Sequence, residues 1–313
     1  MDTTAVARLP LRDQPRPGES INGYIARMAD QNRLDRAKWV ADVAGFKFPQ
    51  VCYGDEEIER LAIATGQEFE TLRPIAPGLS VNTALGKTSS LLGHEVPTDC
   101  LVRVGRRVCP LCLIEAPDHQ ITWTLRFVRF CTKHGCRLIK ACPACGEDLD
   151  WRVGAPDVCR CGHELYYHPA KGTISGADRE EIIGPKYLAD FLSGAQPFEV
   201  PMLSGLKFAE IFLAVRSLGV FGAARGDTFW LDDMMHDKVG IWLTRALRLL
   251  ALDHNPFIDK LISLSPKHLG APNKKHLGIL AEVRAKLTES GAAEAPLVIA
   301  LGEIVDRYPR VLG

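Results

Sequence analysis

Ten cysteines occur in this 313-residue chain, and eight of them fall between Cys109 and Cys161. A cysteine thiolate can bind a metal, attack an electrophile or form a disulfide. Here the cysteines, with one histidine, stand in close pairs, and two donors on one tight turn can reach the same tetrahedral ion. Four such pairs follow one another along the chain: Cys109 with Cys112, Cys131 with His134, Cys142 with Cys145, and Cys159 with Cys161.

Because two pairs supply the four ligands of a structural zinc site, the four pairs predict two Zn²⁺ ions per chain. We favour a sequential assignment, in which the first two pairs bind one ion and the last two pairs bind the other. Gly146 and Gly162 directly follow the second cysteine of a pair, as expected where a knuckle needs a permissive backbone. A cross-brace, which joins the first pair to the third and the second to the fourth, stays open at this stage.

Two neighbouring residues leave the ligand assignment open in detail. Cys136 could replace His134 as a ligand of the first site, although the spacing of His134 fits a knuckle better. His163 could similarly replace Cys161 in the second site. We assign His134 and Cys161 as the ligands.

Neither predicted site has the features of a catalytic zinc. A catalytic zinc keeps one coordination position open for water, whereas each of these sites has four strong ligands. The chain also contains no H-E-x-x-H motif, which would mark a zinc-dependent hydrolase. We therefore expect both sites to be structural and the protein to be non-enzymatic, with no catalytic and no organic-cofactor residues.

The segment from Arg103 to Lys140 is basic. Eight basic residues stand against Glu115 and Asp118, a net charge of +6, and a Cys3His zinc site would lower it to about +5. This bias suits contact with phosphate or with an acidic protein partner, although a solvated face that offsets the thiolates explains it equally well. The candidate contact residues are five arginines: Arg103, Arg106, Arg107, Arg126 and Arg129.

The whole chain, by contrast, is electrically neutral. It has 38 Lys and Arg against 38 Asp and Glu, which excludes a strongly basic coat for nucleic acid. No apolar signal segment opens the sequence, and no window approaches the roughly 18 apolar residues of a membrane span. We therefore expect a cytoplasmic protein without membrane contact, where disulfides are rare. Cys52 and Cys100 stand alone and are expected to be small buried hydrophobic residues.

Helices are expected to position the cysteine module from the N-terminal side. The pattern predicts a helix capped by Ser20, a second that ends at Gly45 and a third capped by Asp55. Around Gly66 the spacing is typical of a helix-turn-helix. Its second helix, over residues 67–73, is acidic and stops at a proline, which argues against base readout.

After about residue 175, apolar residues again recur at three-to-four spacing, which predicts helices. We expect Pro185 at the first position of one helix, a loop over 193–205, and four further helices between residues 206 and 290. The predicted fold class is mainly α with small zinc-ribbon modules built from β-hairpins or knuckles. Three domains are expected: a helical N-terminal domain with a helix-turn-helix-like region over 1–100, a tandem zinc-ribbon module over 101–173, and an α-helical domain over 174–313.

Two blocks of this sequence are similar to one known family. "RPGESINGYIARMA" resembles an opening P-x-E-S motif followed by an aromatic residue and an arginine. "CPLC", the following Trp123, "CTKHG" and "CPACG" resemble a zinc block, which "CRCG" closes. Together they resemble the TniQ/TnsD family of transposition target-selection proteins over roughly residues 9–167. The matching motif residues are Pro17, Glu19, Ser20, Tyr24 (where tryptophan would be expected) and Arg27.

The resemblance implies a non-enzymatic adaptor. Such proteins link a targeting element, either a DNA site or an RNA-guided CRISPR effector complex, to an AAA+ ATPase regulator that recruits the transposase. Auxiliary contact with DNA, association with the nucleoid during transposition and a homodimeric assembly are expected with it. The alternative is a sequence-specific, zinc-containing DNA-binding transcriptional regulator.

Overall fold

The computed structural model describes residues 6–167, 179–195, 197–222, 238–265, 267–268, 271–272 and 274–308. The chain divides into two compact units, each described by itself below. Unit 1 comprises Met1–Val81, Ser89–Gly93 and Thr98–Ser175, and unit 2 comprises Asn82–Thr88, His94–Pro97 and Gly176–Gly313. The three domains expected from the sequence remain a prediction.

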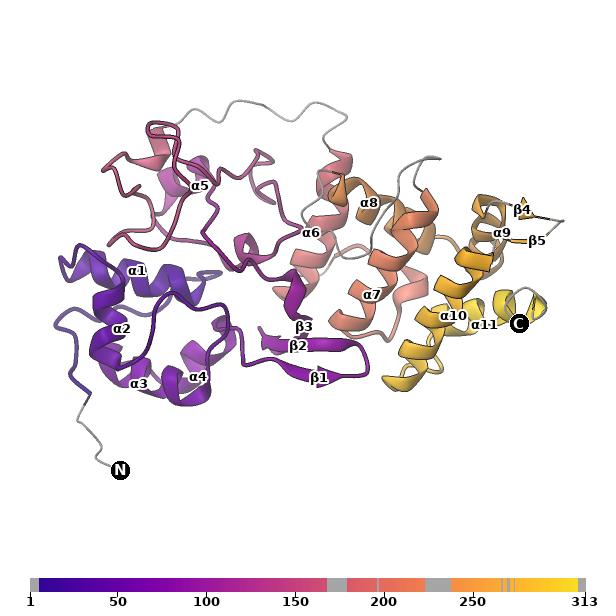
Figure 1. Ribbon diagram of the computed structural model, residues 1–313, viewed down its shortest axis with the longest axis horizontal. Helices are drawn as coiled ribbons and strands as arrows, with labels where there is room; N and C mark the ends of the chain where they lie inside the picture. The colour runs from indigo at the N-terminus through magenta and orange to yellow at the C-terminus, as the bar shows by residue number, and fades with distance from the viewer. Residues whose placement is uncertain are drawn as a thin grey trace. The chain divides into compact units, whose positions relative to one another are not determined.

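Helices of unit 1 begin and end largely where the sequence predicts. The N–H of Gly23 donates to the hydroxyl of Ser20 (3.1 Å), which confirms Ser20 as the cap of α1. Gly45 ends α2 with a φ of 79°, a conformation that glycine adopts without strain. The described helices of this unit are α1 (Ile21–Gln31), α2 (Lys38–Ala44), α3 (Asp55–Thr65), α4 (Phe69–Leu72) and α5 (Pro110–Glu115) (Figure 1).

The helix-turn-helix-like region consists of α3 and α4. Gly54, not Asp55, is the N-cap of α3, and its N–H donates to the side chain of Glu57 (2.9 Å). The predicted cap is therefore wrong by one residue, because the Glu57 carboxylate already satisfies this helix start. Gly66 ends α3 with a φ of 65°, but α4 is a single turn of four residues. A helix this short cannot lay several side chains along a major groove, so base readout by α4 has no structural support.

A three-stranded sheet follows α4, and the sequence analysis did not predict it. Its strands, neighbours in chain order, are β1 (Val81–Thr83), β2 (Gly86–Leu91) and β3 (His94–Pro97). Between β2 and β3, Leu92 and Gly93 both have positive φ, 51° and 78°, as in a tight hairpin turn. The strands are short, and polar residues such as serine and threonine interrupt their apolar residues, so no apolar β-branched run marks them in the sequence.

From residue 179 onward, the described part of unit 2 is mainly helical, as predicted. The final helix begins with a proline at its first turn, a start signal that the sequence analysis missed. None of the helices that the structure describes has the length and apolar character needed to cross a membrane. The elements are α6 (Glu180–Leu192), α7 (Phe208–Leu218), α8 (Val239–Leu250), α9 (His254–Leu264), α10 (Lys274–Glu289), α11 (Pro296–Arg307) and the antiparallel pair β4 (Lys267–His268) and β5 (Ala271–Pro272).

Pro185 lies inside α6, so the prediction that it begins a helix is wrong. Proline cannot donate a helical hydrogen bond, and its ring disturbs the preceding turn. Helix α8 compensates at this point. The N–H of Gly184 donates to the hydroxyl of Thr244 (2.8 Å), and that hydroxyl donates to the carbonyl of Glu180. The hydroxyl of Thr244 thus bridges Gly184 and Glu180 where the proline disturbs the preceding turn, and α6 continues through this position.

The core of unit 1 includes part of the cysteine module. Trp151, which lies between the two pairs of the predicted second site, is buried in one cluster with Tyr24 and Met28 of α1. Phe48 packs edge-on against it, with ring centroids 6.4 Å apart. The module is therefore built into the helical core and does not form a separate appendage.

Candidate metal centres

The first cluster gathers donors from two knuckles. The Sγ atoms of Cys109, Cys112 and Cys131 and a ring nitrogen of His134 all lie within 4.8 Å of one another. Nδ1 of His134 is 3.2 Å from Cys112, 3.5 Å from Cys109 and 3.7 Å from Cys131. Cys109 caps α5, and Pro110 occupies its first position. Within each knuckle, the N–H of the second donor residue points to the first sulfur at 3.4 Å.

A carboxylate holds the imidazole of His134 from its far side. Nε2 of His134 lies 3.0 Å from Oε1 of Glu115, which also pairs with Lys133. Hydrogen bonds from Lys133 and His134 lower the pKa of Glu115, so the carboxylate is charged at neutral pH. Such a partner fixes the ring orientation of a metal-binding histidine and raises the basicity of its free nitrogen. His134 is therefore oriented to present Nδ1 to an ion.

A fifth sulfur lies beside the first cluster. Sγ of the buried Cys136 is 3.3 Å from Sγ of Cys109, but the group of four mutually close donors contains His134 and not Cys136. Hydrogen bonds from Cys112, Cys131 and Cys136 lower the pKa of Cys109. Cys136 is thus placed to donate a hydrogen bond to the thiolate of Cys109. This hydrogen bond would stabilise the negative charge of the thiolate, although less strongly than a metal ion does.

The second cluster contains four cysteines whose Sγ atoms also lie within 4.8 Å of one another: Cys142, Cys145, Cys159 and Cys161. Cys142 is 3.8 Å from Cys161, and Cys145 is 3.8 Å from Cys159. The first cysteine of each pair is buried and the second is exposed. The glycine after each second cysteine has a positive φ, 77° and 85°. The group contains Cys161 and not His163, and the pairs assemble in sequential order.

Both donor sets fit a tetrahedral zinc ion. Bonds of about 2.3 Å to sulfur and about 2.0 Å to nitrogen place two sulfurs about 3.8 Å apart and a sulfur and a nitrogen about 3.5 Å apart. The sulfurs of Cys112 and Cys131 are 3.5 Å apart, and those of the second cluster have the 3.8 Å separations given above. Thiolate and imidazole donors favour zinc over hard cations such as magnesium. Either cluster could therefore hold one metal ion with a closed set of four ligands.

The loop between the two knuckles of the first cluster contacts the start of α1. Oγ of Ser20 lies 2.8 Å from Nδ1 of His119, and the N–H of Ser20 donates to the carbonyl of His119 at 2.8 Å. One step further along, the N–H of Ile121 donates to the carbonyl of Gly18 at 2.7 Å. The P-x-E-S motif thus joins the helical core to the first cluster.

Glu19 and Arg27 form a buried ion pair behind this contact. Nε and Nη2 of Arg27 lie 2.8 Å and 2.7 Å from the two carboxylate oxygens of Glu19, and both side chains are almost fully buried. Arg27 also donates to the carbonyl of Gln14 (2.8 Å), and the hydroxyl of Tyr24 donates to the carbonyl of Asp13 (3.0 Å). The motif residues therefore fasten the N-terminal segment to α1.

His119 links the surroundings of the two clusters, and the sequence analysis did not single it out. Its ring centroid lies 5.2 Å from that of Trp123 and 4.8 Å from that of Trp151. Burial lowers the pKa of His119 to about 3, and the positive charges of Arg106 and Arg107 add to the effect. The imidazole is therefore neutral at physiological pH. No spacing in the sequence marks this role, because His119 belongs to neither cysteine pair.

Two of the five arginines predicted to contact phosphate turn their guanidinium groups inward: Arg106 is buried, and Arg107 is half-buried with a buried Nε. Arg106 donates to the carbonyl of Pro156, and Arg107 donates to the carbonyls of Trp123 (2.9 Å) and Leu125 (2.7 Å). Burial lowers the pKa of each arginine to about 10, so both remain charged at neutral pH. Their guanidinium groups hold loops of the cysteine module together and are turned away from an external phosphate.

The other three arginines differ in exposure. Arg103 is exposed, whereas Arg126 and Arg129 are half-buried. Arg126 donates to the carbonyl of Asp99 at 3.1 Å. Contact with phosphate or with an acidic partner stays a prediction for these residues, and Arg103 is the most accessible of them.

Comparison with known families identifies part of this structure. Residues 10–138 match the family model described as TniQ. The match includes the P-x-E-S motif and all four donors of the first cluster, and it ends before the second cluster begins. A search of curated proteins returns no match to the chain.

Proposed function

We propose that the protein selects targets for transposition, because residues 10–138 match the model of the TniQ family, a family of non-catalytic adaptors in transposition. In this role it links a targeting element, either a DNA site or an RNA-guided CRISPR effector complex, to an AAA+ ATPase regulator and thereby to the transposase. The observation that carries the proposal is the family match over α1–α4 and the first cluster, which the Glu19–Arg27 pair and His119 join into one unit.

The chemistry of the two clusters supports an adaptor. Each donor set is closed, with four strong ligands and no position for a reacting water. We propose that each cluster holds one structural Zn²⁺, the first through Cys109, Cys112, Cys131 and His134 and the second through Cys142, Cys145, Cys159 and Cys161. Bound zinc would hold the intervening loops rigid, so that they present a fixed surface to protein partners.

Binding of the purified protein to the AAA+ ATPase regulator of the same transposon tests this proposal. We expect the two proteins to co-elute in size-exclusion chromatography at micromolar concentration with ATP present, and light scattering would give the stoichiometry, including any homodimer. The variant Glu19→Gln should lose binding because it leaves Arg27 buried without its partner. Glu95→Gln, at an exposed position in β3, is the matched control and should bind normally.

Absence of binding to both the regulator and a targeting complex would contradict the adaptor role. The alternative, a DNA-binding transcriptional regulator, makes a different prediction. It requires the protein alone to retard a defined duplex, with an affinity that falls steeply as salt rises. The single-turn α4 and the internal positions of Arg106 and Arg107 give this alternative less support.

A further inference from the structure

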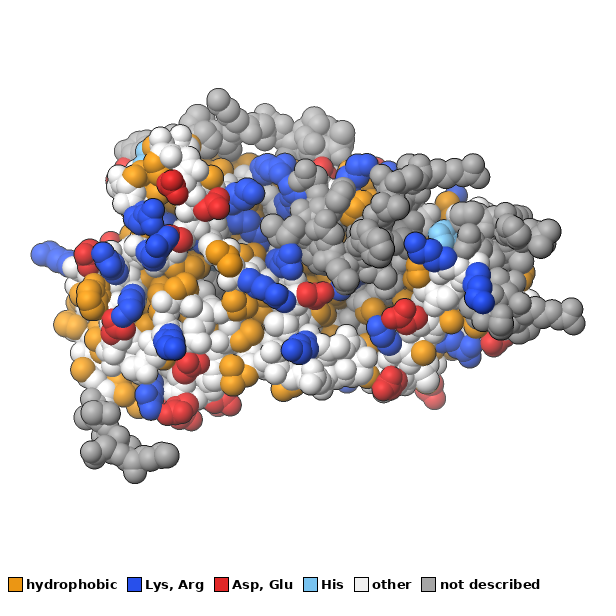
Figure 2. Space-filling view, in the orientation of Figure 1, with side chains coloured by type: hydrophobic (Ala, Val, Ile, Leu, Met, Phe, Trp, Pro, Cys, Tyr) orange, Lys and Arg blue, Asp and Glu red, His pale blue; other side chains and the backbone are white. Residues whose placement is uncertain are grey.

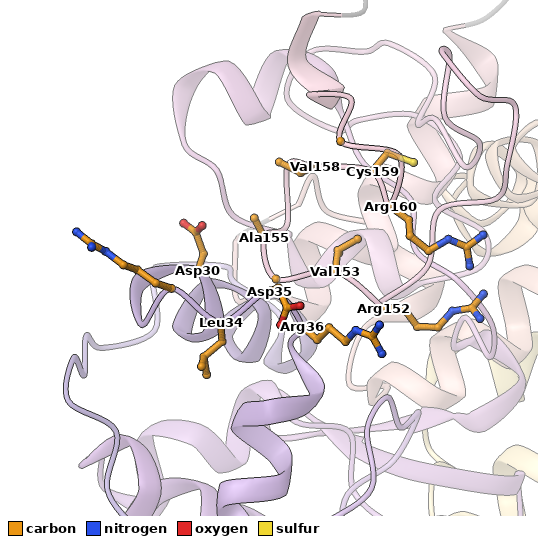
Figure 3. A pocket seen from close by; sticks show the side chains of 13 residues that line it. Asp30, Leu34, Asp35, Arg36, Arg152, Val153, Ala155, Val158, Cys159 and Arg160 are labelled. Atoms are coloured by element: carbon orange, nitrogen blue, oxygen red, sulfur yellow. The ribbon is translucent and has the colours of Figure 1, made fainter.

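A groove of about 640 Å³ lies in unit 1 between the connection from α1 to α2 and the second cysteine cluster (Figure 3). One wall is the chain from Asp30 to Arg36, and the other comes from residues 152–162. The walls are joined directly, because the N–H of Ala37 donates to the carbonyl of Val153 at 2.8 Å. At Gly154, a Cβ would lie only 2.3 Å from the carbonyl oxygen of Leu34. The two walls of the groove are therefore in tight backbone contact and hold each other in place.

Arginines dominate the charge of this groove. Four of them line it, against Asp30 and Asp35. In Figure 3 the side chains of Arg36, Arg152 and Arg160 extend in the same direction. Arg152 and Arg160 share one carboxylate, that of Asp150, at 2.7 Å and 3.7 Å.

Among the described residues, the guanidinium of Arg36 has no ion-pair partner. Figure 2 shows Lys and Arg side chains spread over the visible face of unit 1, with several Asp and Glu side chains near its lower edge. The guanidinium of Arg36 can therefore donate hydrogen bonds to an external anion in the groove.

An exposed indole stands next to the arginines. Leu34 lines both this groove and an adjoining apolar one, which also contains Pro10, Trp39 and Val43. The side chain of Trp39 is 46% exposed, yet it is held in place, because its Nε1–H donates to Asp35 at 3.0 Å. Nζ of Lys38 lies 5.7 Å from the centroid of the Trp39 ring, and the rest of the exposed indole is available in the groove that adjoins the arginines.

We propose that this surface binds a short stretch of single-stranded nucleic acid. Guanidinium groups recognise phosphate oxygens through paired hydrogen bonds, and an exposed aromatic ring stacks on an unpaired base. In this arrangement the phosphodiester backbone contacts Arg36, Arg152 and Arg160, and one unpaired base stacks on the indole of Trp39. A duplex would leave Trp39 without a role, because its bases are already stacked. The inference stands apart from the adaptor role, since it needs only this groove.

Fluorescence anisotropy with the full-length, zinc-loaded protein tests the proposal. The probes are fluorescein-labelled oligonucleotides of mixed sequence and about 12 residues, within the range of known single-strand sites. One is DNA, one is RNA, and a duplex of the same sequence and an acidic peptide serve as competitors. We expect a single strand to bind at least about tenfold more tightly than the duplex, and the DNA and RNA arms to show which backbone is preferred.

Two variants test the assigned contacts. Arg36→Ala with Arg152→Ala should weaken binding and reduce the slope of log affinity against log salt by about 1.4, or about 0.7 for each lost phosphate contact. Trp39→Ala should weaken binding about tenfold with little change in that slope. Lys47→Ala with Arg60→Ala removes the same charge from positions outside the groove, of which Lys47 is exposed and Arg60 is half-buried, and should bind like the wild type. Zinc content checks that each variant is folded.

Three results would overturn the proposal. Equal affinity for single strand and duplex would exclude a single-strand site, and stronger binding of the acidic peptide would assign the groove to a protein partner. If the arginine variant lost zinc from the second cluster but bound the oligonucleotide normally, these arginines would serve only to offset the thiolate charge.

Discussion

Both cysteine clusters are built from two close pairs of donors, but the clusters lie in different surroundings. The first contains a histidine backed by Glu115, has the extra thiol of Cys136 at its edge and lies inside the TniQ match. The second is all cysteine, exposes Cys145 and Cys161, and lies beyond the match. Solvent access to a thiolate governs how readily a chelator or oxidant attacks it. Two clusters of paired donors within the same unit thus differ in how accessible their ligands are to solvent.

Removal of one ligand from each cluster is the strongest way to break this comparison. We expect Cys131→Ala to lose the first metal ion and to unfold much of unit 1, because structural zinc contributes about 10–16 kcal/mol of folding free energy in small zinc modules. Cys161→Ala should lose the second ion but keep α1–α4 folded. Zinc per chain by mass spectrometry and thermal unfolding by circular dichroism measure both effects. Equal destabilisation by the two substitutions would show that the clusters are equivalent.

Glu19→Gln tests whether the first cluster depends on the helical core. The substitution leaves Arg27 charged and buried without its partner, which typically costs about 3–5 kcal/mol. We expect the free energy of unfolding, measured in urea, to fall by that amount, and the first metal ion to be released more easily than in the wild type. With Glu95→Gln both quantities should stay unchanged. A loss of the second ion before the first in the Glu19 variant would refute the proposed coupling.

Glu115→Gln sharpens the comparison at the level of the metal ligands. Without the carboxylate, Nδ1 of His134 becomes a weaker and less well oriented donor. The zinc affinity of the first cluster should then fall about 10- to 100-fold, while that of the second cluster should not change. Competition with a chromophoric chelator resolves the two ions. An unchanged affinity at the first cluster would mean that Glu115 serves only its ion pair with Lys133.

The smallest expected effect concerns pH. Burial lowers the pKa of His119 to about 3, well below the unfolded value of about 6.5. Between these values the unfolded chain binds a proton that the folded chain does not bind. The stability due to neutral His119 is therefore complete above pH about 6.5 and is lost as the pH falls through that window.

His119→Gln keeps a polar group near Ser20 but cannot titrate. Its free energy of unfolding should consequently depend less on pH between 7 and about 5 than that of the wild type. Urea unfolding at both pH values gives the comparison, and metal release in acid affects both proteins alike. Identical pH dependence would mean that folding does not lower the pKa of His119.

By itself, the sequence determined the features that depend on local spacing. Two donors on one knuckle are close because the chain between them is short, so the pairs themselves follow from the sequence, whereas their sequential grouping is seen only in the structure. The start of α1 at Ser20 and the end of α2 at Gly45 can likewise be predicted from residues next to them in the sequence. The family resemblance rests on the same local motifs, and the match over residues 10–138 confirms it.

Only the tertiary structure decided what surrounds those local features. Arg106 and Arg107 resemble surface charges in the sequence, but carbonyl groups from distant loops bury them. Pro185 lies within a helix because Thr244, far along the chain, supplies a hydrogen bond. His119 is neutral because rings and arginines from both clusters enclose it. Burial and long-range hydrogen bonds depend on which segments meet in space, and short-range patterns do not carry that information.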